Sequence, residues 1–321
     1  MQTSTFKVNK VGIAMAAYEP DPSFFGEQLR SIQEQTFSDW VCIVNCDSSL
    51  ESFLKLPEMS RFVSDHRFKW RENKERLGHK KNFEAAIQAV LTEGVNAIAC
   101  ADQDDIWYKD KLAVSVDELE KHGPLSLVHC DMHVLANGKI AEKTAWEIEM
   151  RGIHNSSARH LMIRNIVAGC SMLFDAELAR RYPRIPDGAM FHDHWYALVA
   201  SLNGGVFPIK QALYAYRQHE ANEVGVTPFV GRFVMPSKRR MSLRDVLEKC
   251  ELGWLKSYNF ANSARKEGLQ FNFFERQVFL APFDLGAGIM FLGLRSFFSD
   301  PPLARACIAR SIGKAIHVLL G

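Results

Sequence analysis

Short apolar runs alternate with segments of helical periodicity along residues 11–121, and this alternation strongly limits the folds open to the chain. Four apolar runs predict buried strands, at residues 11–18, 40–44, 67–70 and 97–101. Three segments with apolar residues three and four positions apart predict helices, at residues 24–35, 80–91 and 111–121. Strands that alternate with helices form a mostly parallel sheet with helices on both faces, so the sequence predicts an α/β fold.

After residue 125 the pattern changes, and strands of mixed orientation are expected. Apolar runs predict three more strands, at residues 127–134, 166–174 and 205–216. Helices are predicted to begin at Asp175 and at His192, and the second reaches Ser201.

The last third of the chain is predicted to be helical from about residue 227. We therefore expect an α/β domain over residues 1–226 and a C-terminal helical extension over residues 227–321. Residues 283–298 are largely apolar but fall short of the roughly 20 residues of a membrane span. They predict either a buried helix or a helix lying on the inner membrane surface. Whether the extension packs on the sheet, covers a cleft, contacts a membrane or forms a homodimer stays open.

Composition excludes several classes of protein. The net charge is +2, so no overall field attracts nucleic acid, and no nucleic-acid partner is expected. The seven cysteines include no CxxC pair, which argues against a zinc site or a disulfide framework. Five of them lie in apolar runs and are predicted to be reduced core residues: Cys42, Cys46, Cys100, Cys130 and Cys170. Reduced thiols and an N-terminus without a signal-like apolar segment predict a cytoplasmic location, at most peripheral to the inner membrane face.

Three aspartates, Asp102, Asp104 and Asp105, follow the apolar run 97–101. Carboxylates this close repel one another and raise one another's pKa values unless a cation lies between them. Carboxylate oxygens at a strand end suit Mg²⁺ or Mn²⁺, which can also bind the phosphates of a substrate. The cluster therefore points to chemistry on a nucleotide diphosphate compound. A solvated acidic turn that begins a helix is the alternative.

Two other predicted strands also end at candidate ligand-binding residues. Tyr18 follows the first strand and Asp47 follows the second. Ligands bind beyond the carboxyl ends of the strands in such sheets, so we expect both residues to line one site with the acidic cluster. Asp47 also suits a turn that needs no ligand, and this alternative stays open.

An ordered set of motifs resembles the family-2 glycosyltransferases of the GT-A fold, and among them the bacterial rhamnosyltransferase-like proteins. The resemblance extends from residue 8 to about residue 226. The motifs are Ala17-Tyr18, Gln28-Leu-Arg-Ser-Ile-Gln-Glu-Gln-Thr with Trp40, Asp47-Ser48, Gly78-His-Lys-Lys-Asn82-Phe83, Asp102-Gln-Asp104-Asp105-Ile-Trp107, Gly169-Cys-Ser-Met, His192-Asp193-His-Trp195 and Tyr216-Arg217-Gln218-His219-Glu-Ala-Asn222. The resemblance implies a Rossmann-like GT-A sheet that binds a nucleotide sugar and carries out catalysis within residues 1–226.

The resemblance also implies a role for individual residues. Asp193 would be the catalytic base, and Asp104 would ligate Mn²⁺ or Mg²⁺, with His219 reaching back to the metal or the diphosphate. The donor nucleotide would be bound by Ala17, Tyr18, Glu19, Asp47, Arg76, Lys81, Asp102 and Gln103. The acceptor or sugar pocket would be lined by Trp107, Gly169, His192, His194 and Trp195.

Several of these roles have structural alternatives. Asp193 also suits the cap of the helix that follows it, and Arg76 and Lys81 also suit a solvated helix start. Trp107 and Trp195 also suit core positions.

The expected activity is an inverting, metal-dependent glycosyltransferase of bacterial surface polysaccharide synthesis, such as O-antigen or capsule. The resemblance implies dTDP-rhamnose or a UDP-sugar as donor and a saccharide or lipid-linked glycan as acceptor. A non-catalytic nucleotide- or glycan-binding protein on the same scaffold is one alternative, since a fold does not determine a function. A nucleotidyltransferase is another, and it would release pyrophosphate rather than a nucleoside diphosphate.

Overall fold

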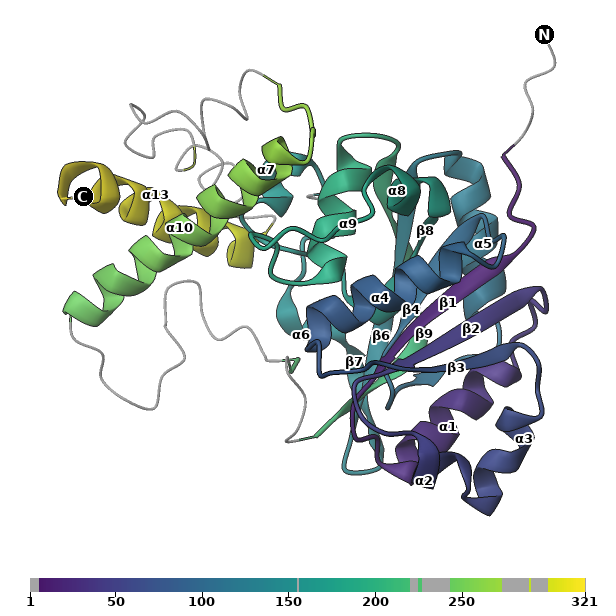
Figure 1. Ribbon diagram of the computed structural model, residues 1–321. Coiled ribbons are helices and arrows are strands. Elements are labelled where there is room, and N and C mark those ends of the chain that lie inside the picture. Colours follow the sequence, from purple (N-terminus) through teal and green to yellow (C-terminus); the bar gives the residue numbers. More distant parts are fainter. Residues whose placement is uncertain are drawn as a thin grey trace, which may run out of the picture. The chain divides into compact units, whose positions relative to one another are not determined.

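The computed structural model describes residues 6–154, 156–219, 225–226, 243–272, 289 and 300–320 (Figure 1). Contacts between residues divide the chain into two compact units. The sheet unit consists of Met1–Ala145, Val167–Ile185 and Phe191–Gly225. The helical unit consists of Trp146–Ile166, Pro186–Met190 and Val226–Gly321. The predicted domains 1–226 and 227–321 stay a prediction.

The sheet unit contains a mixed sheet in the order β3-β2-β1-β4-β8-β6-β9-β5, with β7 paired to β6. The strands are β1 (Val11–Ala17), β2 (Trp40–Cys46), β3 (Phe68–Glu72), β4 (Ala97–Ala101), β5 (Ile106–Trp107), β6 (Ser126–Ala136), β7 (Lys139–Thr144), β8 (Met172–Asp175) and β9 (Gly205–Gln218). β3, β2, β1 and β4 are parallel, and β8 runs antiparallel to both β4 and β6. The predicted α/β fold class is confirmed.

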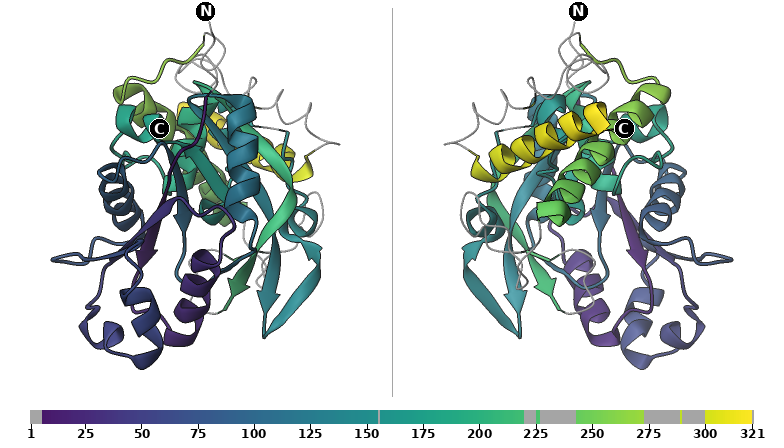
Figure 2. Two further views of the ribbon diagram at one scale, coloured as in Figure 1. Left: turned by 90° about the vertical axis from the view of Figure 1, so that its right-hand side faces the viewer. Right: turned by 90° about the vertical axis from the view of Figure 1, so that its left-hand side faces the viewer.

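Helices cover both faces of this sheet (Figure 2). α4, α8 and α9 lie on one face, and α1 and α5 lie on the other. Their bounds are α1 (Pro22–Gln33), α4 (His79–Leu91), α5 (Lys111–His122), α8 (Ala176–Arg181) and α9 (His192–Ser201), and the β2–β3 connection holds α2 (Glu51–Leu54), η1 (Pro57–Met59) and α3 (Ser60–Val63). Because both faces are covered, β2 and β4 are buried along their whole length, which explains their continuous apolar runs.

Close packing of α4 on β1 depends on a glycine. A Cβ atom at Gly12 would lie 1.9 Å from Cγ1 of Val90 on α4. On the opposite face, Gln35 donates a hydrogen bond to the carbonyl of Tyr108 and accepts one from the backbone N–H of Leu112. This side chain joins the end of α1 to the start of α5.

One predicted strand was partly wrong. A strand was predicted at residues 166–174, but β8 begins only at Met172 and is preceded by the 3₁₀ turn η2 (Gly169–Ser171). The backbone N–H and the hydroxyl of Ser171 both donate to the carbonyl of Ala168, which closes this turn. An apolar sequence does not by itself distinguish such a turn from a strand. The predicted cap at Asp175 is present, since its carboxylate accepts from the N–H of Glu177 at the start of α8.

The helical unit includes α7 (Ala158–Leu161), α10 (Leu243–Lys266) and α13 (Pro301–Leu320), while α6 (Ala145–Glu149) begins at the boundary between the units. α10 and α13 pack so closely that a Cβ at Gly313 would lie 2.0 Å from the carbonyl oxygen of Cys250. The helical character predicted beyond residue 227 is present in both. Of the apolar stretch 283–298, all but Ile289 lies outside the described residues. None of the described helices is both long enough and apolar enough to cross a membrane.

Candidate functional site

The predicted site residues of the first strands meet at one edge of the sheet. β1 is parallel to β2 on one side and to β4 on the other, so the carboxyl ends of the three strands lie side by side. Tyr18, Asp47 and Asp102 each follow one of these ends. The backbone N–H of Asp47 donates to the carbonyl of Ala17, which joins the first two ends directly.

A layer of three asparagines supports the Asp47 carboxylate. Nδ2 of Asn45 donates to Oδ1 of Asn73 at 3.0 Å and to Oδ1 of Asn82 at 2.7 Å, and Asn82 donates in turn to the carbonyl of Ala17. Asn73 donates to Oδ1 of Asp47 at 2.6 Å, and the N–H of Gly78 donates to Oδ2 at 2.8 Å. Carboxylate oxygens accept more than one hydrogen bond, so Asp47 is held in place and can still accept from a ligand.

Gln103 fixes the backbone of Tyr18. Its Oε1 accepts from the N–H of Tyr18 at 2.8 Å, and its Nε2 donates to the carbonyl of the same residue at 3.2 Å. The guanidinium carbon of Arg76 lies 4.0 Å from the centre of the exposed Tyr18 ring. Glu19 has a φ of 41°, and its N–H donates to Oγ of Ser48 at 2.9 Å. These contacts bring Tyr18, Glu19, Arg76 and Gln103 together, as the donor-binding prediction requires.

Cys170 lies directly against Asp102. Its Sγ accepts from the backbone N–H of Asp102 at 3.0 Å and donates to Oδ2 of the same residue at 2.8 Å. Burial, together with the carboxylates of Asp102 and Asp105, raises the pKa of the Cys170 thiol well above its usual range. Cys170 is therefore a protonated hydrogen-bond donor rather than a thiolate.

The acidic cluster continues in the loop between β4 and β5. Oδ2 of Asp104 lies 2.9 Å from Nε2 of His219, which follows β9. Burial and the carboxylate of Asp102 raise the pKa of Asp104, whereas the contact with His219 lowers it. Asp105 is fully buried, and burial together with Asp102 and Asp104 raises its pKa well above the usual range.

This arrangement fits a divalent cation. The Oδ2 atom of Asp105 is buried and has no hydrogen-bond partner among the described residues, and the three carboxylates repel one another. Asp104 and His219 would supply two neighbouring ligand atoms to such an ion. Ligand atoms of Asp102, Asp105 and Cys170 also lie within 4.8 Å of one another. A protonated thiol is a poor ligand for Mg²⁺ or Mn²⁺, so the pair Asp104–His219 suits such an ion better.

The other predicted residues lie at the start of α9 and in the core. Asp193 is half-buried in the first turn of α9, where its Oδ1 accepts from the N–H of the half-buried His194 at 2.5 Å. Lys81 forms an ion pair with Glu84 at 3.0 Å on its own helix. Trp107 and Trp195 are buried, with exposed fractions of 2% and 0%.

His192 also lies in the core. Its ring stacks on Phe83 with centroids 3.7 Å apart, and a Cβ at Gly169 would lie 2.6 Å from its Nε2. Burial, aided by the nearby His79, lowers the pKa of His192 well below its usual range, so the ring is neutral. The structure places the side chains of His192, Trp107 and Trp195 away from solvent, which agrees with the core alternative for the two tryptophans. Their contacts with an acceptor stay a prediction.

Sequence reasoning missed several residues that hold the site together. Cys170, Asn73 and Arg217 contact the predicted site residues Asp102, Asp47 and Asp104 respectively. Asn45 and Glu27 lie one step further out, because they contact Asn73 and Arg217. None of the five was assigned a role at the site. The local sequence held a signal for two of them, since Cys170 lies in the Gly-Cys-Ser-Met motif and Arg217 in the Tyr-Arg-Gln-His motif.

A sequence model described as glycosyl transferase family 2 matches residues 13–180. The chain belongs to this family. The matched segment contains most of β1, all of β2 and β4, and the acidic cluster, so the strand ends described above belong to the family 2 domain. The chain is therefore a glycosyltransferase.

Two curated relatives agree with this assignment. The chain is 24% identical over 221 residues to dTDP-rhamnosyl transferase RfbG of Shigella flexneri. This match covers 66% of this chain and 73% of that protein. It is 30% identical over 114 residues to the bifunctional glycosyltransferase pgtA of Dictyostelium discoideum, which covers 36% of this chain. The match spans only 15% of the length of pgtA. The predicted likeness to bacterial rhamnosyltransferases within the family is confirmed.

Solved glycosyltransferases share the fold. The structure of S. aureus TarS 1–349 in complex with UDP-GlcNAc has a TM-score of 0.52 at 16% identity, over 96% of this chain and 90% of that one. The mannosyltransferase PcManGT from Pyrobaculum calidifontis, in complex with GDP-Man and Mn²⁺, has a TM-score of 0.50 at 13% identity, over 98% and 88%. At these identities the likeness shows the fold alone, which is GT-A.

Proposed function

We propose that this glycosyltransferase moves a sugar from a nucleotide diphosphate donor to a saccharide or lipid-linked glycan, with inversion at the anomeric carbon and with a divalent metal ion. The observation that carries the proposal is the 2.9 Å contact between Oδ2 of Asp104 and Nε2 of His219 at the sheet edge of a family 2 domain. TarS binds UDP-GlcNAc and PcManGT binds GDP-Man with Mn²⁺ on the same fold, which supports a nucleotide-sugar donor and a metal ion here.

The donor base is assigned to the ends of β1 and β2. Asp47, held by Asn73 and Gly78, would accept the N3–H of a pyrimidine, and the exposed Tyr18 ring would lie against the base. Asp102 would bind the ribose. We take dTDP-rhamnose as the first candidate donor because of the likeness to RfbG, and a UDP-sugar as the second.

The diphosphate is assigned to the acidic loop. Asp104 and His219 would hold Mn²⁺ or Mg²⁺ there, and a bound ion supplies positive charge to the departing diphosphate. Arg76, which lies over the Tyr18 ring, and Lys81 on α4 would add positive charge on the same side.

Asp193 is assigned the role of general base. Its carboxylate would take the proton of an acceptor hydroxyl while that oxygen forms a bond to the anomeric carbon. The bond between the anomeric carbon and the phosphate oxygen breaks, and its electron pair leaves with the nucleoside diphosphate. Attack from the face opposite the leaving group inverts the anomeric configuration. The N–H of His194 orients the Asp193 carboxylate for this step.

We further propose that the acceptor is a growing surface polysaccharide of a bacterium, assembled at the cytoplasmic face of the membrane. The likeness to a dTDP-rhamnosyl transferase of Shigella flexneri supports this assignment.

A donor scan tests the proposal. The purified chain is incubated with a saccharide acceptor and with dTDP-rhamnose or one of a set of UDP-sugars, each with Mn²⁺ or with EDTA, and nucleoside diphosphate release is measured. We expect release from one donor, its loss with EDTA, and its loss in Asp193→Asn with donor binding kept. Asp39→Asn is the matched control, because Asp39 is exposed at the opposite end of β2. Donor binding with no turnover in the wild type would instead indicate a non-catalytic binding protein, and pyrophosphate release would indicate a nucleotidyltransferase.

A further inference from the structure

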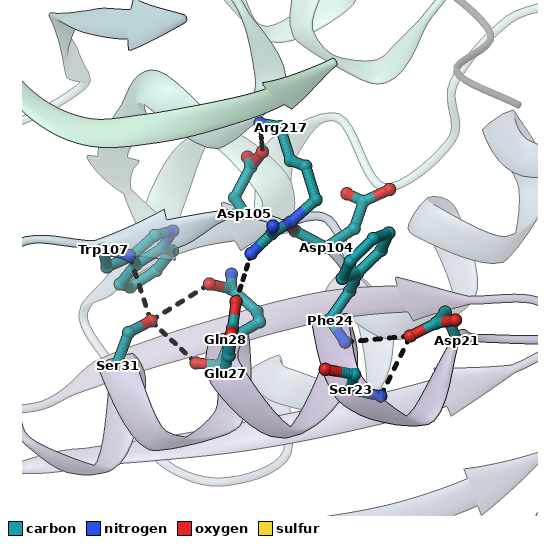
Figure 3. A network of polar contacts seen from close by, with 10 residues as sticks. All are labelled: Asp21, Ser23, Phe24, Glu27, Gln28, Ser31, Asp104, Asp105, Trp107 and Arg217. Atoms are coloured by element: carbon teal, nitrogen blue, oxygen red, sulfur yellow. Dashed lines mark hydrogen bonds and ion pairs between the residues drawn. The ribbon is translucent and has the colours of Figure 1, made fainter. Parts of the chain in front are cut away.

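Arg217 contacts two of the three aspartates in the loop between β4 and β5, one through its backbone and one through its side chain. Its backbone N–H donates to Oδ1 of Asp105 at 3.1 Å, and its Nε donates to the carbonyl oxygen of Asp104 at 2.8 Å. His219 lies two residues further along the same segment. Arg217 therefore links the loop that carries Asp104 to the segment that supplies His219, and Figure 3 shows it beside Asp104 and Asp105.

Arg217 also contacts two residues of α1. The guanidinium group forms an ion pair with the carboxylate of Glu27, and its central carbon lies 4.2 Å from the centre of the Phe24 ring. The Phe24 ring also stacks on His219, with centroids 5.9 Å apart and an angle of 29° between the planes. Phe24 and Glu27 are three positions apart, so they lie on one face of the helix.

The same face of α1 contacts the acidic loop at two more points. Nε2 of Gln28 donates to the carbonyl of Asp102, and Oγ of Ser31 accepts from the N–H of Trp107. The start of the helix is fixed as well, because the Asp21 carboxylate accepts from the N–H groups of Ser23 and Phe24 (Figure 3). α1 is thus a rigid support that runs beneath the loop.

The two members of the ion pair differ in exposure. The side chain of Arg217 is 12% exposed, whereas that of Glu27 is 44% exposed. Removing the Arg217 side chain would therefore leave the half-buried carbonyl oxygen of Asp104 without this donor, but Glu27 can be changed at the surface with little risk to folding. The contacts described for Glu27 do not include Asp104 or His219.

We propose that Arg217, held by Glu27 of α1, is a positioning residue that sets the distance between Asp104 and His219 and thereby the affinity for the metal ion. This inference rests on the proposed metal-dependent function. Outer residues that orient metal ligands change metal affinity by about 10- to 100-fold when they are replaced. The guanidinium fork suits this task, since it donates to a carbonyl and a carboxylate at once in a fixed geometry.

The test measures Mn²⁺ affinity in the chain without donor, by electron paramagnetic resonance titration, and the unfolding midpoint of each variant. We expect Glu27→Gln and Arg217→Lys to weaken Mn²⁺ binding by about 10- to 100-fold. Glu177→Gln is the matched control, because Glu177 pairs with Arg181 on α8 at a similar exposure of 40%. It should bind Mn²⁺ like the wild type.

The outcomes separate the inference from the proposed function. If the wild type binds Mn²⁺ and both variants bind it equally well, the inference is overturned and the metal site stands. If Glu27→Gln lowers only the unfolding midpoint, the ion pair is merely structural, which also overturns the inference. If the wild type itself binds no Mn²⁺, the proposed metal dependence fails, and the inference fails with it.

Discussion

Oδ2 of Asp104 lies 2.9 Å from Nε2 of His219, although the two residues are 115 positions apart in the sequence. The short strand β5 explains this proximity. Ile106 pairs with Ala215 and Trp107 with Tyr214, so β5 carries the loop after β4 to the far end of β9. The acidic loop and the histidine therefore meet because of strand register.

We predict that Asp104→Asn abolishes Mn²⁺ binding and lowers nucleoside diphosphate release by at least about 100-fold, because a bound ion stabilises the leaving group by several kcal/mol. Asparagine keeps the size of the side chain but removes its charge. Isothermal titration with Mn²⁺ and a release assay check this. Asp39→Asn should behave as the wild type, and an Asp104→Asn variant that keeps full metal affinity would show that the ion binds elsewhere.

Asp193→Asn should separate catalysis from binding. The loss of a general base is expected to lower kcat by about 100- to 10,000-fold. The donor dissociation constant should not change, because Asp193 is assigned to the acceptor side. Single-turnover kinetics and donor titration measure the two quantities. A kcat within a factor of two of the wild type would rule out Asp193 as the base.

Gln103→Ala is expected to weaken donor binding rather than chemistry. The side chain makes two hydrogen bonds to the Tyr18 backbone, and each is worth about 1 kcal/mol, so the donor KM should rise by up to about 30-fold. Gln88→Ala is the control, because Gln88 on α4 donates only to the carbonyl of Pro183 at the surface among the contacts described. Equal donor KM values for the two variants would argue against a role for Tyr18 in donor binding.

Two glycine substitutions should change stability in opposite directions. Gly12→Ala should lower the free energy of unfolding by about 1–3 kcal/mol, since its Cβ would overlap Val90. Gly26→Ala in α1 should raise it by about 0.5–1 kcal/mol, since its Cβ meets no atom within 4 Å and alanine favours a helix. Urea unfolding measures both. A Gly12→Ala variant with the free energy of unfolding of the wild type would mean that α4 packs less closely on β1 than described.

Acid should weaken one surface ion pair. Hydrogen bonds from Arg67 hold the pKa of Asp65 well below its usual range, so Asp65 contributes stability above its unfolded pKa of about 3.9. That contribution is lost as the pH falls below this value. Asp65→Asn should therefore cost about 1 kcal/mol at pH 7, and the difference from the wild type should shrink below about pH 4. Urea unfolding at several pH values checks this, and a difference that does not depend on pH would exclude the ion pair as its source.

The strands whose carboxyl ends carry the site could be predicted because the sequence pattern of each strand is local. β1, β2 and β4 are buried on both faces, and their continuous apolar runs place each of them to within two residues. Tyr18, Asp47 and Asp102 then follow from the rule that ligands bind at strand ends. The five cysteines predicted to be reduced core residues are indeed free and buried.

The remaining features depend on contacts between distant segments. The two-residue strand β5 has too few residues for a periodic pattern, and it is defined only by its pairing with β9. The ion pair of Glu27 with Arg217 joins residues 190 positions apart, and the sequence around either residue does not indicate the other as its partner. The turn at Gly169 likewise depends on a contact between distant segments, because it places Cys170 against Asp102.

The most direct measurement is a crystal of the chain grown with Mn²⁺ and a nucleoside diphosphate, with anomalous diffraction recorded at the manganese edge. The account predicts one strong anomalous peak beside the Asp104 carboxylate and His219, in contact with the diphosphate. A peak held by Asp102, Asp105 and Cys170 instead, or a bound nucleotide with no peak beside Asp104, would contradict it.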